Sequence, residues 1–304
     1  MRPSYLELHE SGELARRAEK ATAMLSDCAL CPRSCSVDRS SKLGVCRTGL
    51  RAVITGLAPH FGEESPLVGR HGSGTIFIVY CNLNCAFCQN WSTSHTGEGR
   101  KVGPEPLAAA MIGLMRLGCH NINFVTPSHV VPQILQALPH AIDMGLSVPL
   151  VYNSSGYDNV ETLRLLDGVF DLYMPDVKFF ARDSAEQYCK APDYPEVVKA
   201  ALSEMHRQVG DLALTDDGIA TRGLLVRHLV MPGAIEDTRE IMAFLADTIS
   251  KKTYVNVMAQ YRPCGEADRF PEIMRRITPE EYREAVQAAC DAGLERLDDR
   301  RRRW

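Results

Sequence analysis

The sequence lacks any long uninterrupted hydrophobic run. No apolar stretch approaches the roughly 20 residues that a membrane-spanning helix needs, and Met1-Arg2-Pro3-Ser4 opens into an amphipathic segment, not a signal-like one. We therefore expect a cytoplasmic protein without a membrane partner. An excess of positive charge is also missing, because the net charge is −4, which argues against nucleic acid as a partner. The run Arg300–Arg303 is an exception, which we interpret as a solvated terminus.

Internal repeats and low-complexity linkers are absent as well. The 304 residues are 45% hydrophobic and 24% charged, which is typical of a globular protein with one large core. What is abundant is cysteine, with eleven residues. In a reducing compartment these are expected to avoid disulfides, so clustered cysteines indicate metal binding or catalysis. Four isolated ones are interpreted as buried small hydrophobic residues, namely Cys119, Cys189, Cys264 and Cys290.

Three cysteines with C-x3-C-x2-C spacing directly follow the apolar run 75–80, which predicts a buried strand. Cys81, Cys85 and Cys88 therefore lie on a loop that leaves a strand end, where α/β proteins usually place their chemistry. Three thiolates can hold three irons of a [4Fe-4S] cluster and leave the fourth iron open. Zinc is the alternative, but it favours a fourth Cys or His about four residues on, and His95 is the next.

Short β-branched or aromatic runs alternate with helical patterns along most of the chain. Strands are predicted at 75–80, 121–125, 148–152, 170–174, 224–231 and 254–258, and helices at 106–117, 131–143, 159–166, 196–209 and 237–249. This alternation predicts an α/β fold whose parallel sheet curls into a partial barrel. A helix at 5–26 precedes it, a hairpin is expected at 211–222, and Thr278 with Glu281 predicts a capping box for a last helix.

The cysteine motif, with Phe87 just before its last cysteine, resembles the signature of the radical S-adenosylmethionine (SAM) superfamily. Together with Cys28–Cys35 and Val226–Gly233, it resembles a branch of uncharacterised iron–sulfur proteins related to pyruvate formate-lyase activating enzyme. The resemblance runs from Cys28 to about Pro263. It implies a partial (β/α)6 TIM-like barrel in which SAM binds the open iron. One electron from an external donor such as flavodoxin or ferredoxin then yields a 5′-deoxyadenosyl radical that abstracts hydrogen from substrate.

Charged residues at the strand ends match this resemblance. Asp176 and Lys178 resemble an Asp-x-Lys element near the SAM methionine moiety, where each could pair with one charge of the amino acid. A surface ion pair is the alternative. Arg227 interrupts an apolar strand and needs an anion such as the SAM carboxylate, unless it faces outward. Arg262 stands where the activating enzyme has a histidine.

Uncharged polar residues complete the expected SAM site. Asn153 and Ser155 could hold the ribose hydroxyls. Many radical SAM enzymes carry Gly-Gly-Glu after the second strand, whereas here Thr126 or Ser128 would accept from the SAM amino group. His129 is interpreted as a buried wall residue, with a substrate-side acid as the alternative.

A second group of cysteines precedes the barrel. Cys28, Cys31, Cys35 and Cys46, with Gly44 providing a turn, can close a four-thiol site for structural Zn²⁺ or an auxiliary [4Fe-4S] cluster. Because this segment lies ahead of the barrel, we expect it apart from the catalytic loops and favour a structural role.

These observations predict two parts: an N-terminal helix with a cysteine-rich metal-binding segment (1–70), and a radical SAM partial barrel with a C-terminal helix (71–304). The leading hypothesis is a radical SAM enzyme, oxidoreductase-like, whose substrate is a small molecule or a polypeptide. One alternative is a glycyl-radical-enzyme activase that acts on a partner protein. Another is a non-catalytic iron–sulfur protein for electron transfer.

Overall fold

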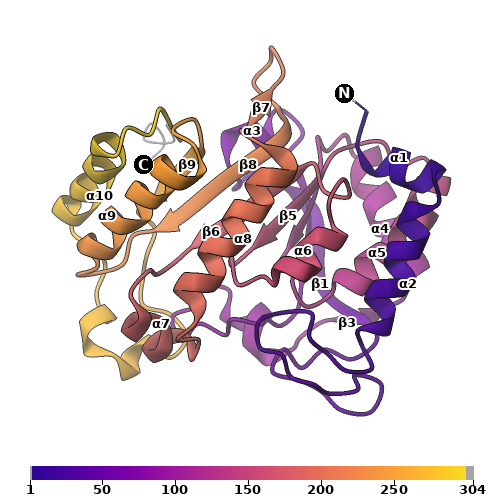
Figure 1. Ribbon diagram of the computed structural model, residues 1–304, viewed down its shortest axis with the longest axis horizontal. Helices are drawn as coiled ribbons and strands as arrows, with labels where there is room; N and C mark the ends of the chain where they lie inside the picture. The colour runs from indigo at the N-terminus through magenta and orange to yellow at the C-terminus, as the bar shows by residue number, and fades with distance from the viewer. Residues whose placement is uncertain (1, 299–304) are drawn as a thin grey trace.

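A mainly parallel sheet forms the centre of the computed structural model, which describes residues 2–298 (Figure 1). The strand order is β10-β9-β8-β6-β5-β4-β2-β1-β3, and β7 pairs with β8 off this path. Six consecutive parallel strands follow chain order, as a series of βα units requires. They are β2 (Ser73–Ile78), β4 (Ile122–Val125), β5 (Leu150–Ser154), β6 (Leu172–Val177), β8 (Ala220–Leu229) and β9 (Tyr254–Met258). The strand order begins at β10 and ends at β3, and these two edge strands do not pair with each other. The sheet is therefore open, and the predicted partial barrel is confirmed.

Helices follow the strands and cover the outer face of the sheet (Figure 1). The five predicted ones are present as α4 (Pro104–Arg116), α5 (Val131–Asp143), α6 (Val160–Leu165), α8 (Tyr194–Val209) and α9 (Ile235–Phe244). The last continues as a π-helical turn, Leu245–Ile249. Asn159 is the N-cap of α6, because its side chain accepts a hydrogen bond from the Glu161 backbone.

The prediction of a single helix at 5–26 is wrong, because the structure has two helices there. Helices α1 (Tyr5–Glu10) and α2 (Glu13–Ala23) meet at Gly12, whose φ of 74° lies in the left-handed region. Glycine adopts this conformation without steric cost, and it ends one helix before the next begins. The buried side of α2, which includes Leu14 and Ala21, belongs to the main core.

Several elements escaped prediction. They are β1 (Ala52–His60), α3 (Ser65–Val68), β3 (Arg100–Val102), α7 (Arg182–Cys189) and β10 (Arg296–Leu297). Strand β1 contains Gly56 and Pro59, which ordinarily indicate a loop. It nevertheless pairs antiparallel with β2, with a register shift between Ile54 and Gly56, so residues before position 70 add to the same sheet.

The two flanking features are confirmed. Strand β7 (Ala213–Leu214) pairs antiparallel with β8 through a turn in which Gly218 has a φ of 78°. Helix α10 (Pro279–Asp291) begins with the Thr278/Glu281 capping box and lies beside α9 at one end of the sheet (Figure 1).

The cysteine-containing segments gather at one end of the molecule. Loop 81–88 and segment 28–46 both lie in the lower part of Figure 1. The β7 hairpin lies at the opposite end. Within residues 2–298 no helix has the length and apolar character to cross a membrane. The arginine run at 300–303, which we interpreted as a solvated terminus, lies outside the described residues.

Candidate functional site

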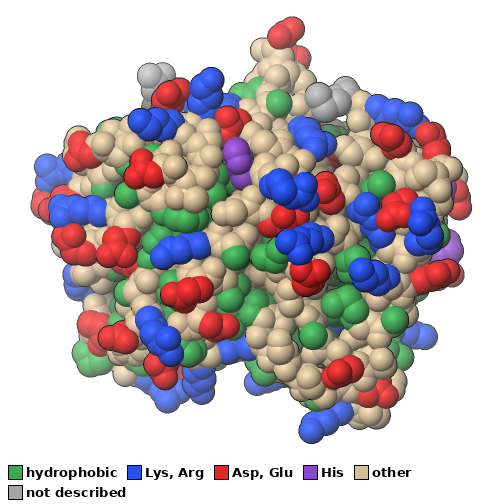
Figure 2. Space-filling view, in the orientation of Figure 1, with side chains coloured by type: hydrophobic (Ala, Val, Ile, Leu, Met, Phe, Trp, Pro, Cys, Tyr) green, Lys and Arg blue, Asp and Glu red, His purple; other side chains and the backbone are tan. Residues whose placement is uncertain are grey.

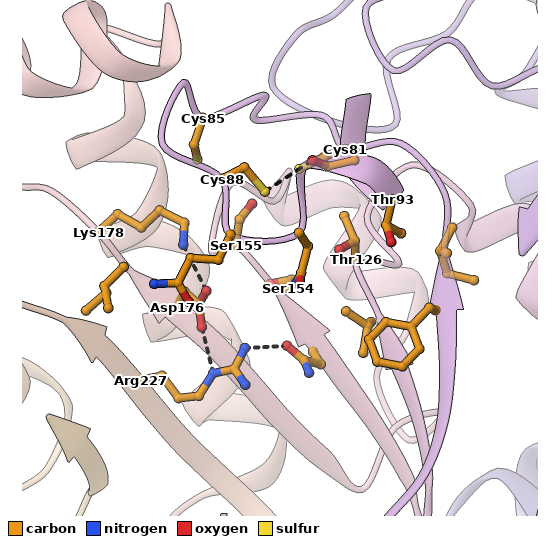
Figure 3. A pocket seen from close by; sticks show the side chains of 18 of the residues that line it. Cys81, Cys85, Cys88, Thr93, Thr126, Ser154, Ser155, Asp176, Lys178 and Arg227 are labelled. Atoms are coloured by element: carbon orange, nitrogen blue, oxygen red, sulfur yellow. Dashed lines mark hydrogen bonds and ion pairs between the residues drawn. The ribbon is translucent and has the colours of Figure 1, made fainter. Parts of the chain in front are cut away.

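The three thiols of the C-x3-C-x2-C motif line one cavity of about 230 Å³ (Figure 3). The loop that carries them bends where Tyr80 and Asn84 adopt φ values of 69° and 53°. The Cys81 Sγ accepts from the Leu83 backbone at 3.3 Å, and the Cys88 Sγ accepts from the Ser94 hydroxyl at 3.1 Å. These bonds orient sulfur atoms that would otherwise rotate freely.

The thiols are protonated without a metal. Burial raises the pKa of Cys81 to about 12. A hydrogen bond with the Cys189 thiol and burial together raise the pKa of Cys85 well above its ordinary value. Because a metal ligand must be a thiolate, iron binding at this loop would release protons.

The donor set fits an iron–sulfur cluster in its chemistry. It consists of three soft sulfur ligands on one loop that faces a common space. Among residues 2–298, no three His, Cys, Asp or Glu side chains converge closely enough to hold a metal ion as they stand. The fold thus supplies the ligand types and their common location.

Phe87 anchors the cluster loop (residues 81–88) on the barrel. Its ring packs edge-to-face against Phe179 and Tyr188, at centroid distances of 5.8 and 6.2 Å. Next to it, the Ala86 backbone donates to the Tyr188 carbonyl at 2.8 Å and accepts from the Glu266 backbone at 2.7 Å. These contacts hold the thiols between β2 and the helix α7 region.

Asp176, Lys178 and Arg227 form a charged network in the same cavity (Figure 3). Asp176 and Arg227 are register partners on adjacent parallel strands. The Arg227 Nε donates to Asp176 Oδ1 at 2.6 Å, and the Lys178 Nζ donates to Asp176 Oδ2 at 2.9 Å. Arg227 therefore faces inward, and its first anion is a carboxylate of the protein.

Two further residues brace Arg227 from other elements. Its Nη2 donates to the Asn153 Oδ1 at 2.7 Å, and its Nη1 lies 3.5 Å from the Glu63 Oε2. The predicted ribose contact Asn153 thus already engages one amide oxygen within the protein. The guanidinium is fixed in orientation by partners from β5, β6 and the segment before α3.

Electrostatics keeps the network ionised. Burial favours the neutral form of Asp176, but the neighbouring Arg227 and Lys178 charges outweigh it and lower the pKa of this carboxyl. Burial also disfavours the charged Lys178, yet the Asp176 carboxylate raises the pKa of this ammonium above its ordinary value. The cavity therefore presents both signs of charge to a ligand, as recognition of a zwitterion requires.

Ser155 offers an unused hydroxyl. Its Oγ is buried, lines the cavity and has no hydrogen-bond partner in the protein. Leaving a buried polar group without a partner costs about 1–3 kcal/mol, so a polar ligand atom is expected there. Thr126, with a φ of 64°, lines the same cavity after β4.

The structure does not bring two predicted residues to this cavity. Ser128 is buried outside its lining, and Arg262 is exposed on the loop after β9. Gln260, two residues beyond the end of β9, lines the cavity in place of Arg262. The rule that functional residues follow strand ends could have found Gln260, whereas the direction of each side chain depends on the loop.

His129 is a buried wall residue, as interpreted from the sequence. Its Nε2 lies 3.0 Å from the Val79 carbonyl, and burial lowers the pKa of the imidazole to about 4. The ring is therefore neutral near pH 7 and donates to Val79.

The four N-terminal cysteines lie near one another. Burial raises the pKa of Cys31 to about 12, and the thiols of Cys46, Cys28 and Cys35 add to the effect. A Cβ at Gly44 would lie 2.9 Å from the Cys35 Sγ, so glycine serves a close approach there. Four soft sulfur donors in one segment fit the expected second metal in their chemistry.

The expectation that this segment lies apart from the catalytic loops is wrong. Arg33 donates through Nε and Nη2 to the carbonyls of Asn82 and Leu83, at 2.9 and 3.0 Å, inside the cluster loop. It also donates to the carbonyls of Cys189, at 2.8 Å, and Lys190. A planar guanidinium with five donors can bridge carbonyls from two separate segments, 82–83 and 189–190, which makes this contact feasible.

Comparisons with known proteins give one close sequence relative and distant structural ones. No family model matches the sequence. Two solved structures of anSMEcpe with bound AdoMet, the second also with Kp18Cys peptide, superpose with TM-scores of 0.48 and 0.49 at 10% and 8% identity. The matches cover 72% and 71% of this chain, which spans 61% and 60% of theirs.

The sequence relative is the uncharacterized protein MJ0674 of Methanocaldococcus jannaschii. It is 32% identical over 302 residues, and the match covers 97% of this chain and 83% of the relative. Identity at this level over nearly the whole length shows that the chain belongs to the family of MJ0674.

Proposed function

We propose that this protein is a radical SAM enzyme that abstracts a hydrogen atom from its substrate. The observation that carries the proposal is the shared cavity. The three motif thiols face the same space as the ionised Asp176/Lys178/Arg227 network and the unpartnered Ser155 hydroxyl. Together these groups supply the thiolate ligands of a cluster and, beside them, charges of both signs for an amino acid.

In this proposal Cys81, Cys85 and Cys88 hold the [4Fe-4S] cluster. Asp176 and Lys178 face the amino and carboxylate groups of SAM, and Arg227 fixes the Asp176 carboxylate in place. When bound, the cluster and SAM together supply reductive cleavage to a 5′-deoxyadenosyl radical. The chain itself binds and orients the cofactors, and the aromatic packing around Phe87 excludes water from one wall.

Anaerobic reconstitution tests the function directly. Protein loaded with iron and sulfide, then given dithionite and SAM, should release 5′-deoxyadenosine even without substrate, because an uncoupled radical is quenched by buffer. Iron content, SAM binding by equilibrium dialysis and product by chromatography are the measurements. A protein that carries its iron but neither binds SAM nor forms product would contradict the proposal and favour an electron-transfer role.

Replacing Arg227 by methionine tests the charged network. SAM binding should weaken by about 1.5–3 kcal/mol, because Asp176 loses the charge-assisted hydrogen bond that fixes it in the SAM site; this corresponds to roughly 10- to 150-fold. The same change removes the cation that faces Asp176 and Glu63, so unfolding should become easier by about 3–5 kcal/mol. Titration calorimetry on the folded protein gives the affinity, and chemical denaturation gives the stability.

The exposed Arg262 supplies the matched control. Because it lies outside the cavity, Arg262→Met should keep the SAM affinity of the parent. Unchanged affinity in Arg227→Met would contradict the role of Arg227 in the SAM site, and a larger loss in Arg262→Met would indicate that Arg262 contacts SAM instead.

The finer parts of the function are further proposals. We propose a second metal, Zn²⁺ or an auxiliary [4Fe-4S] cluster, at Cys28, Cys31, Cys35 and Cys46. The substrate is a small molecule or a polypeptide; a barrel with an open side admits a polypeptide loop, which supports the activase alternative. An external one-electron donor such as flavodoxin or ferredoxin and a reducing compartment, the cytoplasm, suit the proposed chemistry.

A further inference from the structure

A second cavity, of about 770 Å³, lies on the other side of the cluster loop. Asn84 and Ala86, which flank Cys85 in sequence, line this second cavity, whereas the motif cysteines line the first. Cys189, whose thiol is hydrogen-bonded with Cys85, lines it as well. The cluster loop is therefore a thin wall between two cavities, and the second opens next to the proposed cluster without passing through the SAM site.

Positive charge surrounds the second cavity. Arg33, Arg47, Lys190 and Arg269 line it, and Glu266 is the carboxylate among its lining residues. Arg47, Lys190 and Arg269 are exposed and come from three separate segments of the chain. In Figure 2 the lower edge of the molecule is indented, and Lys and Arg side chains lie around the indentation. Since the whole chain carries a net charge of −4, this local excess of cations is a distinct feature of one face.

A hydrogen-bonded chain joins this cavity to the cluster ligand Cys88. The rings of Trp91 and His95, both in the cavity wall, stack at a centroid distance of 3.7 Å. The His95 Nδ1 lies 2.7 Å from the Ser94 Oγ, and the Ser94 hydroxyl donates to the Cys88 Sγ at 3.1 Å. The Ser94 oxygen thus accepts from His95 Nδ1–H. Hydrogen bonds to ligand sulfur atoms tune reduction potentials, so Ser94 and His95 would influence the potential of a cluster held by Cys88.

We propose that the second cavity and its cationic rim form the docking surface for an acidic electron-transfer protein of the flavodoxin or ferredoxin class. The inference rests on the proposed function, because it requires a cluster at Cys81, Cys85 and Cys88. In the step, the donor protein is oxidised by one electron and the cluster is reduced by one electron; no covalent bond forms or breaks.

The observations favour a protein over a small anion. Arg269 is paired with Glu266 at 2.6 Å, so the rim keeps a net positive charge through Arg47 and Lys190. Exposed cations spread in this way steer an acidic surface from a distance, whereas a small anion would need buried donors that converge on one point. Aromatic side chains of Trp91, Tyr188 and Phe270 line the cavity between the cations. Aromatic residues and arginine are the types enriched where proteins meet.

Charge reversal at the rim tests the docking surface by a binding measurement. The probe is a purified flavodoxin with an acidic surface, titrated into the reconstituted protein at 50 and 300 mM salt. Parent protein should bind at least about 10-fold more weakly at the higher salt, as expected for electrostatic association. Lys190→Glu/Arg269→Glu should weaken binding at 50 mM salt by roughly 10- to 100-fold and flatten the salt dependence. Lys190→Gln/Arg269→Gln should fall between the two.

Arg116→Glu/Lys252→Glu is the matched control. It makes the same change in net charge at two exposed residues that line neither cavity, and it should bind flavodoxin within about twofold of the parent. Equal losses in both charge-reversed proteins, parent-like binding by Lys190→Glu/Arg269→Glu, or parent protein without salt-dependent binding would each overturn the docking surface.

Dithionite separates this inference from the proposed function. As a small reductant it needs no docking, so dithionite-driven formation of 5′-deoxyadenosine should be the same in the parent and in both charge-reversed proteins. Absence of product from the parent with dithionite would contradict the proposed function, while the flavodoxin titration would still report on the surface.

Discussion

Replacing Cys85 by alanine should abolish 5′-deoxyadenosine formation and remove most of the iron of the reconstituted protein. Cys85 is buried, faces the cavity and is the middle ligand of three. With two thiolates left, a cubane would have two irons without protein ligands and would not be retained. Iron analysis, the absorption spectrum of the cluster and chromatography of the product measure the effect.

Two other cysteines provide the controls for this prediction. Cys290, which was expected to be buried, is instead exposed on α10, so Cys290→Ala should retain iron and product. Cys189 shares a thiol hydrogen bond with Cys85, which the sequence had not suggested. Cys189→Ala should also retain product, and Cys85→Ala/Cys189→Ala tells whether Cys189 can replace the lost ligand. Product at the parent rate in the double variant would show that the catalytic site is assigned wrongly.

Replacing Cys31 by alanine should release the second metal and lower thermal stability strongly. Binding free energy at a structural metal site is folding free energy, and values of about 10–16 kcal/mol are typical of zinc-finger peptides near neutral pH. The parent should contain about one zinc if the metal is structural, or about eight irons if both sites hold cubanes. A parent with about four irons and no zinc would leave these cysteines without a metal role.

Cys31→Ala should also reduce the amount of cluster at the motif, although no motif cysteine is changed. Arg33 lies two residues after Cys31 and donates to the carbonyls of Asn82 and Leu83. Loss of the metal frees the segment that positions this guanidinium. Arg33→Ala separates the two effects, because it should retain the second metal while weakening the cluster loop. A normal cluster spectrum in Arg33→Ala would show that the loop holds its shape without this bridge.

The sequence alone determined most of the scaffold. Apolar runs of strand length, separated by helical patterns, predicted all six parallel strands, because both periodicities are local properties of the chain. Local rules also identified the cap at Thr278 and Glu281. They did not identify β1, because Gly56 and Pro59 favour a loop until pairing with β2 supplies backbone hydrogen bonds.

For the site, the sequence determined which residue types lie at strand ends, and the tertiary structure decided which of them meet. Asp176 and Arg227 meet because parallel register places them opposite each other. Ser128 and Arg262 do not reach the cavity, because the path of a loop after its strand depends on contacts with distant segments. The bridge from Arg33 to the cluster loop spans about 50 positions in sequence. No periodicity encodes a contact at that separation, since it forms only when the whole barrel brings the two segments together.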